Sequence, residues 1–164
     1  MVDIVCLEYA LAARNEMFDI VTAEGNDAIV FPHIDSCIGV VFLHADGKAT
    51  AGHVSVIAAS EKVGEEVSLT EMLGRMRDWT GAAVQRVILI GHPAWRQVAA
   101  RVLAADQALS AVPCDDHCSF NDPIDVFVEL GNRKLRVQAW QPDHGRDVTV
   151  PPARTGDWLL DANL

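Results

Sequence analysis

The sequence predicts an α/β sandwich in which helices pack on a mixed β-sheet. Short runs of β-branched and aromatic residues are bounded by turn-forming residues, as in strands, and two segments have the apolar spacing of amphipathic helices. Half of the 164 residues are hydrophobic, which is enough for one buried core. We therefore expect a single domain over residues 1–164, with its core at about 28–140 and an irregular tail at 141–164.

The chain up to residue 57 is predicted to contain mainly strands. Residues 4–17 fit either a short strand or an alanine-rich helix, and residues 28–31 fit a buried strand. We expect Pro32 to end that strand, because proline has no N–H group to donate to a neighbouring strand. Residues 36–57 predict a β-hairpin with a tight turn at 45–47.

The segment after this hairpin predicts a polar loop and then a helix. Residues 58–66 are mostly polar, and Ser68 followed by Glu71 has the pattern of a helix-capping box. Gly81 is expected to end the helix, because glycine readily adopts the left-handed conformation found at helix C-termini. The residues of the expected apolar face are Leu69, Met72, Leu73, Met76 and Trp79.

The second half of the chain predicts a strand, a helix and a second hairpin. Residues 84–91 form an apolar run typical of a central strand, and residues 95–109 carry apolar side chains at helical spacing. Residues 124–129 and 134–140 predict a hairpin that turns at 131–132. The expected order of elements is therefore strands, helix, strand, helix, strands.

Two registers of the first hairpin place its cysteine and histidine differently. A two-residue turn puts Cys37 and His53 on opposite faces, whereas a three-residue turn puts Cys37 opposite Ser55, with His53 diagonal to it on the same face. The apolar pattern favours the three-residue turn, because only that register gathers the large apolar side chains on one buried face. Cys37, His53 and Ser55 are then expected together on the solvent side. The apolar residues are Ile38, Val40, Phe42, Val54 and Val56.

Charge and composition limit the class of partner. The formal net charge is −10 and no cluster of lysine or arginine occurs, which argues against nucleic acid or an anionic membrane surface. The N-terminus has no secretory signal pattern, and no apolar stretch approaches the roughly 20 residues that cross a bilayer. We expect a cytoplasmic protein, with export by a signal-independent route left open. Four cysteines are too few for a disulfide framework: Cys6, Cys37, Cys114 and Cys118.

The sequence resembles the CheD family of chemoreceptor glutamine deamidases, whose sheet is shared with cytotoxic-necrotizing-factor-type toxins. The resemblance lies in Ser36-Cys37-Ile38 at the head of one strand, Gly52-His53 in the next, and the order of elements over about 28–140. The family's third member, a threonine six residues before the cysteine, corresponds to Phe31. A main-chain carbonyl near Phe31 and the hydroxyl of Ser55 are the alternatives for orienting His53.

The resemblance implies a cysteine hydrolase that deamidates glutamine side chains of a protein, without a cofactor, in chemotaxis. Cys37 would attack the carboxamide, forming a thioester and releasing ammonia. His53 would take the thiol proton, donate it to the leaving amine and then activate water. Ser36 and His33 are expected to lie on the substrate and oxyanion side, with main-chain N–H groups near Cys37 as oxyanion donors.

Two alternatives belong to other functional classes. The first is a catalytically inactive CheD-like module that binds proteins, which is supported by Phe31 and by Asp35, where the family usually has glycine. The second is a metal-binding domain that uses Cys114, His117 and Cys118.

The metal alternative needs a fourth ligand, for which His92 and His144 are the candidates. Cys-x-x-x-Cys is not the usual spacing of a zinc knuckle, so we favour a polar loop at 114–118 without a metal. A reversible disulfide between Cys114 and Cys118 is the other alternative for such a loop.

Overall fold

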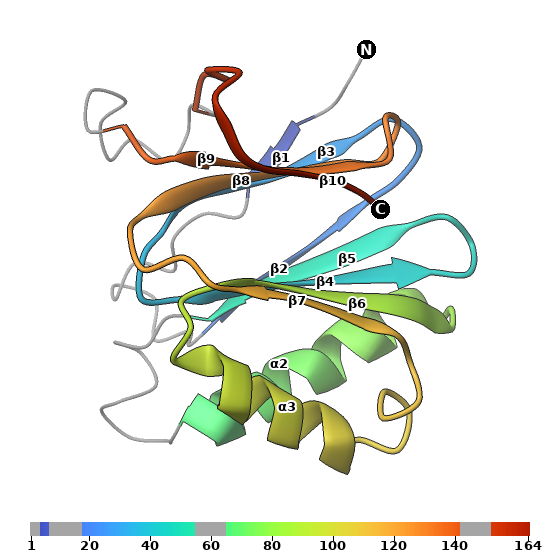
Figure 1. The fold of residues 1–164 in the computed structure, drawn as a ribbon. Coiled ribbons are helices and arrows are strands. Elements are labelled where there is room, and N and C mark those ends of the chain that lie inside the picture. Colours follow the sequence, from blue (N-terminus) through green and yellow to red (C-terminus); the bar gives the residue numbers. More distant parts are fainter. Residues whose placement is uncertain (1–3, 7–17, 55–64, 142–151) are drawn as a thin grey trace.

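A computed structural model of the chain describes residues 4–6, 18–54, 65–141 and 152–164, and these form three layers (Figure 1). The elements are β1 (Ile4–Cys6), β2 (Phe18–Ala23), β3 (Ala28–Ile34), β4 (Ile38–His44), β5 (Ala49–Val54), α2 (Glu65–Thr80), β6 (Val84–Gly91), α3 (Trp95–Ala105), β7 (Cys114–Cys118), β8 (Ile124–Glu129), β9 (Lys134–Ala139) and β10 (Trp158–Asn163). Neither α2 nor α3 is long and apolar enough to cross a membrane.

Two five-stranded sheets pack face to face, and the two helices cover one of them (Figure 1). We call β1-β3-β8-β9-β10 the outer sheet and β2-β5-β4-β6-β7 the central sheet. Each contains one parallel pair, β1 with β3 and β6 with β7, so both sheets are mixed. The predicted α/β class with helices on a mixed sheet is confirmed, but the expectation of one sheet is wrong.

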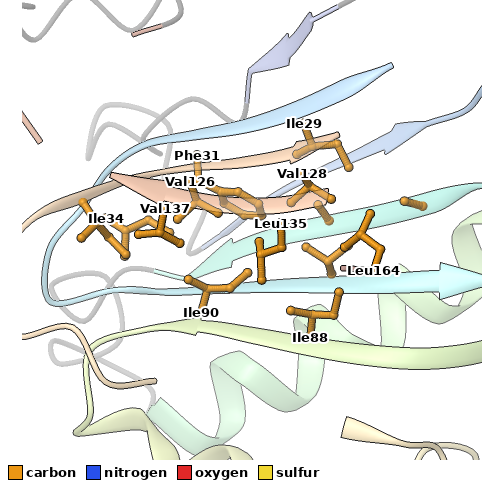
Figure 2. Packing of buried hydrophobic residues seen from close by; sticks show 14 of the residues in the cluster. Ile29, Phe31, Ile34, Ile88, Ile90, Val126, Val128, Leu135, Val137 and Leu164 are labelled. Atoms are coloured by element: carbon orange, nitrogen blue, oxygen red, sulfur yellow. The ribbon is translucent and has the colours of Figure 1, made fainter. Parts of the chain in front are cut away.

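The central sheet is buried on both faces. Even-numbered residues of β4, such as Val40, pack with α2 and α3, while odd-numbered residues, such as Val41, pack with the outer sheet. Figure 2 shows this second contact, in which Ile88 and Ile90 of β6 lie across from Phe31 and other side chains of the outer sheet. Burial on both faces explains why β4 is a nearly continuous apolar run.

The first helix begins earlier than predicted. It starts at Glu65, so Ser68 lies buried inside the helix and the prediction of Ser68 as N-cap is wrong. Gly81 has φ +67° and follows the last helical residue, which confirms the predicted end. Trp79 is 57% exposed and is not part of the core. The other residues of the predicted apolar face are buried against the central sheet: Leu69, Met72, Leu73 and Met76.

One strand boundary and one helix boundary also differ from the sequence prediction, and the N-terminal alternative is resolved in part. Strand β3 continues through Pro32 to Ile34, because a bulge against β8 accommodates the proline. Helix α3 ends at Ala105, and Leu109 is buried in the turn beyond it. Of the ambiguous N-terminal residues 4–17, the first three form β1 and the rest lie outside the described residues.

Two segments predicted to be irregular form edge strands. Part of the predicted tail is β10, which pairs antiparallel with β9 despite a register shift near its start. The predicted loop at 114–118 is β7, which pairs parallel with β6. The expected core of 28–140 contains β7 but leaves out β10, and it also leaves out β1 and β2, which are edge strands of the two sheets.

Candidate active site

The first hairpin adopts the predicted three-residue turn. Gly39 pairs with His53, the His44 N–H donates to the Lys48 carbonyl at 2.9 Å, and Gly47 has φ +82°. Cys37, just before β4, lies in the cluster between the two sheets, on the same side of β4 as Gly39. The register therefore confirms that Cys37 and His53 share one face as diagonal neighbours. Ser55, which the same register would place opposite Cys37, lies outside the described residues.

This shared face does not lie toward solvent, so that part of the prediction is wrong. Cys37 is 1% exposed and His53 is 3% exposed, because the outer sheet covers them. Phe31 of the outer sheet packs onto Gly39, where an added Cβ would lie 2.9 Å from the ring. The small side chains on this face of the hairpin therefore make room for a second sheet.

His53 is held as a neutral base. Burial, assisted by the nearby charge of His33, lowers the pKa of His53 to about 4. At neutral pH the imidazole is therefore unprotonated, and burial makes it a weaker base than a free imidazole. Its ring meets Phe31 edge-on, with centroids 6.3 Å apart. Phe31, the position aligned with the family's threonine, is thus a neighbour of the histidine.

The connection between β6 and α3 holds the chain just before the cysteine. Trp95 Nε1 donates to the Ser36 carbonyl at 2.9 Å, and the His92 main-chain N–H donates to the Cys37 carbonyl at 3.2 Å. Gly91 has φ +155°, and an added Cβ would lie 2.4 Å from the Cys37 oxygen. The sequence prediction did not include Gly91, His92 or Trp95 in the catalytic site. The signal that could have indicated them was the glycine at the end of the predicted central strand.

The glycine of the Gly-His pair has a packing role. A Cβ at Gly52 would lie 2.6 Å from the Met72 sulfur and 2.7 Å from the Met76 sulfur. A residue with a side chain at position 52 would require these two methionine side chains to move. Gly52 therefore makes room for the methionines of α2 beside the strand that carries His53.

His33 occupies the bulge in β3 and has φ +53°, an uncommon conformation for a residue other than glycine. Its N–H donates to Asp125 Oδ1 at 2.9 Å, and Asp125 is almost fully buried. The bulge directs the His33 ring onto Trp140, with centroids 4.3 Å apart. His33 and Trp140 are half-buried, and His33 is close enough to affect the pKa of His53. Both residues lie at the end of the sandwich where β3 leads into β4 and β9 ends.

Cys114 and Cys118 lie at opposite ends of β7, roughly 13 Å apart at the rise of an extended strand. That separation excludes both the disulfide and a shared metal ion in this conformation. Among the described residues, no group of three His, Cys, Asp or Glu is placed to hold a metal, and His144 lies outside them. The metal-binding alternative therefore has no support here.

Ion pairs explain why so polar a segment forms a strand. Asp115 pairs with Arg86 at 2.6 Å and Asp116 with Arg96 at 2.7 Å, which attaches β7 to β6 and α3. Burial and the neighbouring aspartates raise the pKa of Cys114 to about 11 and that of Cys118 to about 12. Neither thiol is activated as a nucleophile.

No family model matches the sequence, and no curated protein matches it. The similarity to CheD proteins therefore consists of the quoted motif residues and the order of the elements. Within the described residues, the three positions aligned with the family's catalytic residues come together around one end of the inter-sheet core: Phe31, Cys37 and His53.

Proposed function

We propose that this protein is a cysteine hydrolase that deamidates glutamine side chains of a protein partner in the cytoplasm. The main support is the hairpin register, which puts Cys37 and His53 on one face as diagonal neighbours. Additional support comes from the contact between Phe31 and His53, because the resemblance aligns Phe31 with the third catalytic position. Chemoreceptors are the substrates that the resemblance implies.

The proposed reaction begins with a neutral pair. As the Cys37 sulfur attacks the carboxamide carbon, its proton passes to His53, which is unprotonated at neutral pH. His53 then donates this proton to the leaving nitrogen, and the C–N bond breaks to give a thioester and ammonia. Water, deprotonated by His53, hydrolyses the thioester to glutamate and restores the thiol. Each main-chain N–H bonded to the oxyanion would contribute ~2.7–4 kcal/mol to transition-state stabilisation.

The proposed reaction requires that the substrate reach two buried side chains, Cys37 and His53. Because both groups are nearly fully buried, a glutamine side chain reaches them only after a local opening. The stack of His33 on Trp140 is the natural place for that opening, since it lies at the same end of the sandwich and is half-buried. We therefore assign His33 to the substrate entrance.

A second candidate function, a protein-binding module without catalysis, is favoured by the burial of Cys37 and by the absence of a hydroxyl at Phe31. In that case Cys37 is a small apolar core residue. The two functions predict different outcomes for the same assay.

Ammonia release from unfolded casein, a glutamine-containing protein, provides the test. Wild type should release ammonia and convert glutamine to glutamate, and Cys37→Ala should lower the rate by about 10³-fold or more. His53→Ala should cause a similar loss, whereas Cys114→Ala, which removes an exposed thiol, should retain the wild-type rate. Equal rates in wild type and Cys37→Ala, or no release by wild type, would favour the binding module.

A further inference from the structure

A cavity of about 440 Å³ opens at the end of the sandwich opposite Cys37. The turn between β4 and β5, the start of β6 and the turn between β8 and β9 meet there, beside the residue marked C in Figure 1. The cavity therefore lies between the two sheets and has walls from both.

Part of the cavity wall is apolar. Leu43, Leu130 and Leu164 line it, and all three belong to or pack against the core between the sheets. Figure 2 shows Leu164 beside Leu135 and Val128 in that core. A ligand here could place an apolar body against these leucine side chains.

The rim of the cavity is cationic. Lys48, Arg86 and Arg133 line it, and no aspartate or glutamate is among its described lining residues, although the chain has a net charge of −10. The carboxylates nearest to two of these cations lie outside the wall: Glu24 pairs with Lys48 at 3.1 Å, and Asp115 pairs with Arg86. The Glu24–Lys48 pair is largely exposed, and such pairs rearrange at little cost.

Arg133 is the cation best placed to receive an anion. Its guanidinium donates to a terminal oxygen of Leu164 at 3.4 Å, a long contact that an anionic ligand would have to displace, and no aspartate or glutamate side chain pairs with it in the described part of the chain. Arg133 also has φ +51°, which costs an ordinary residue on the order of 1 kcal/mol. Glycine would avoid that cost, so the arginine occupies a position that backbone conformation alone does not favour.

We propose that this cavity binds a small amphipathic anion, in which a carboxylate, sulfonate or phosphate group is attached to an apolar body. The acidic group would pair with Arg133, with Lys48 and Arg86 at the rim, and the apolar body would lie on Leu43 and Leu130. A guanidinium is well suited to this role because its fork of N–H groups matches such oxyanions. The site is separate from Cys37 and does not depend on the proposed deamidase activity.

Fluorescence titration of the folded 164-residue chain with 8-anilinonaphthalene-1-sulfonate tests the proposal, because this probe combines an aromatic body with a sulfonate. We expect saturable binding at one site, weakened at least tenfold in Arg133→Met. The matched control is Arg75→Met, which removes a largely exposed arginine from α2 and should leave the affinity unchanged. Thermal unfolding shows whether each variant is folded.

Two further measurements keep the outcome decisive if Arg133→Met does not fold. Lys48→Met, at a half-buried position on the cavity wall, should weaken probe binding severalfold. Octanoate should displace the probe, whereas octanol at the same concentration should not, because it lacks the charge. Absence of saturable binding, equal affinity in all variants, or equal displacement by octanol would overturn the proposal.

Discussion

The two ends of the inter-sheet core differ in chemistry and in access. At the end where β3 leads into β4, a thiol and a neutral imidazole are sealed beneath the outer sheet. At the other end, three cationic side chains and three leucines are among the residues that line an open cavity. The same pair of sheets produces both ends, so the reactive groups and the available space are separated. The register of a hairpin therefore determines which groups meet, whereas the second sheet determines what can reach them.

The largest expected effect is the loss of stability caused by Gly91→Ala. This residue lies at the end of the core that holds Cys37, which we call the closed end. The new Cβ would overlap the Cys37 carbonyl oxygen, 2.4 Å away, and φ +155° would be strained for alanine. Together these should lower the free energy of unfolding by about 3 kcal/mol. Gly81→Ala is the control, since it has positive φ but no atom within 4 Å, and should cost only ~1 kcal/mol. Urea unfolding that gave equal losses would contradict the role of Gly91 as a close contact.

The pH dependence of stability tests the neutral state of His53. Its pKa of about 4 in the folded protein lies below the ordinary value of 6.5, so the unfolded chain binds the proton more readily. The stabilising contribution should be complete above pH ~6.5 and fall by about 3 kcal/mol as the pH drops to about 4. In His53→Gln this part of the slope should vanish. Identical slopes in urea unfolding of the two proteins would argue against a buried neutral histidine.

Removing the Trp140 ring should make the Cys37 thiol accessible to reagents. Trp140→Ala removes the ring that stacks on His33, so iodoacetamide should alkylate Cys37 at least tenfold faster than in wild type. Trp158→Ala is the matched control, because Trp158 packs on Phe127 and not on His33, so its removal should not change that rate. Peptide mass mapping gives the rates, with exposed Cys114 as an internal reference. A Cys37 rate that is the same in all three proteins would exclude this entrance.

The smallest expected effect is that of Gly74→Ala, which changes overall stability without touching either end of the core. Gly74 lies inside α2 with no atom within 4 Å of an added Cβ, so Gly74→Ala should raise the free energy of unfolding by ~0.5–1 kcal/mol. Neither the alkylation of Cys37 nor probe binding at the cavity should change. A change in either would show that general stability, not local structure, controls the two ends.

The sequence was sufficient for local features that depend on periodicity and turn chemistry. The alternation of Val40 with its neighbours and the glycine at position 47 fixed the hairpin register correctly. The sequence was insufficient for β7 and β10. Residues 114–118 become β7 through ion pairs with arginines distant in the sequence. Strand β10 depends on its pairing with β9, which local sequence does not reveal. The small residues beside Cys37 were interpreted as a solvent face, but they accommodate Phe31 from the other sheet.

Covalent trapping of Cys37 tests the proposed hydrolase most directly. A peptide that carries 6-diazo-5-oxo-norleucine in place of glutamine loses nitrogen when an activated thiolate attacks it, leaving a stable thioether. We predict that mass spectrometry will find the label on Cys37 in wild type, that excess glutamine peptide will protect it, and that His53→Ala will lose it. An unlabelled Cys37, or labelling that neither the competitor nor the His53 substitution reduces, would contradict a glutamine-directed nucleophile at this position.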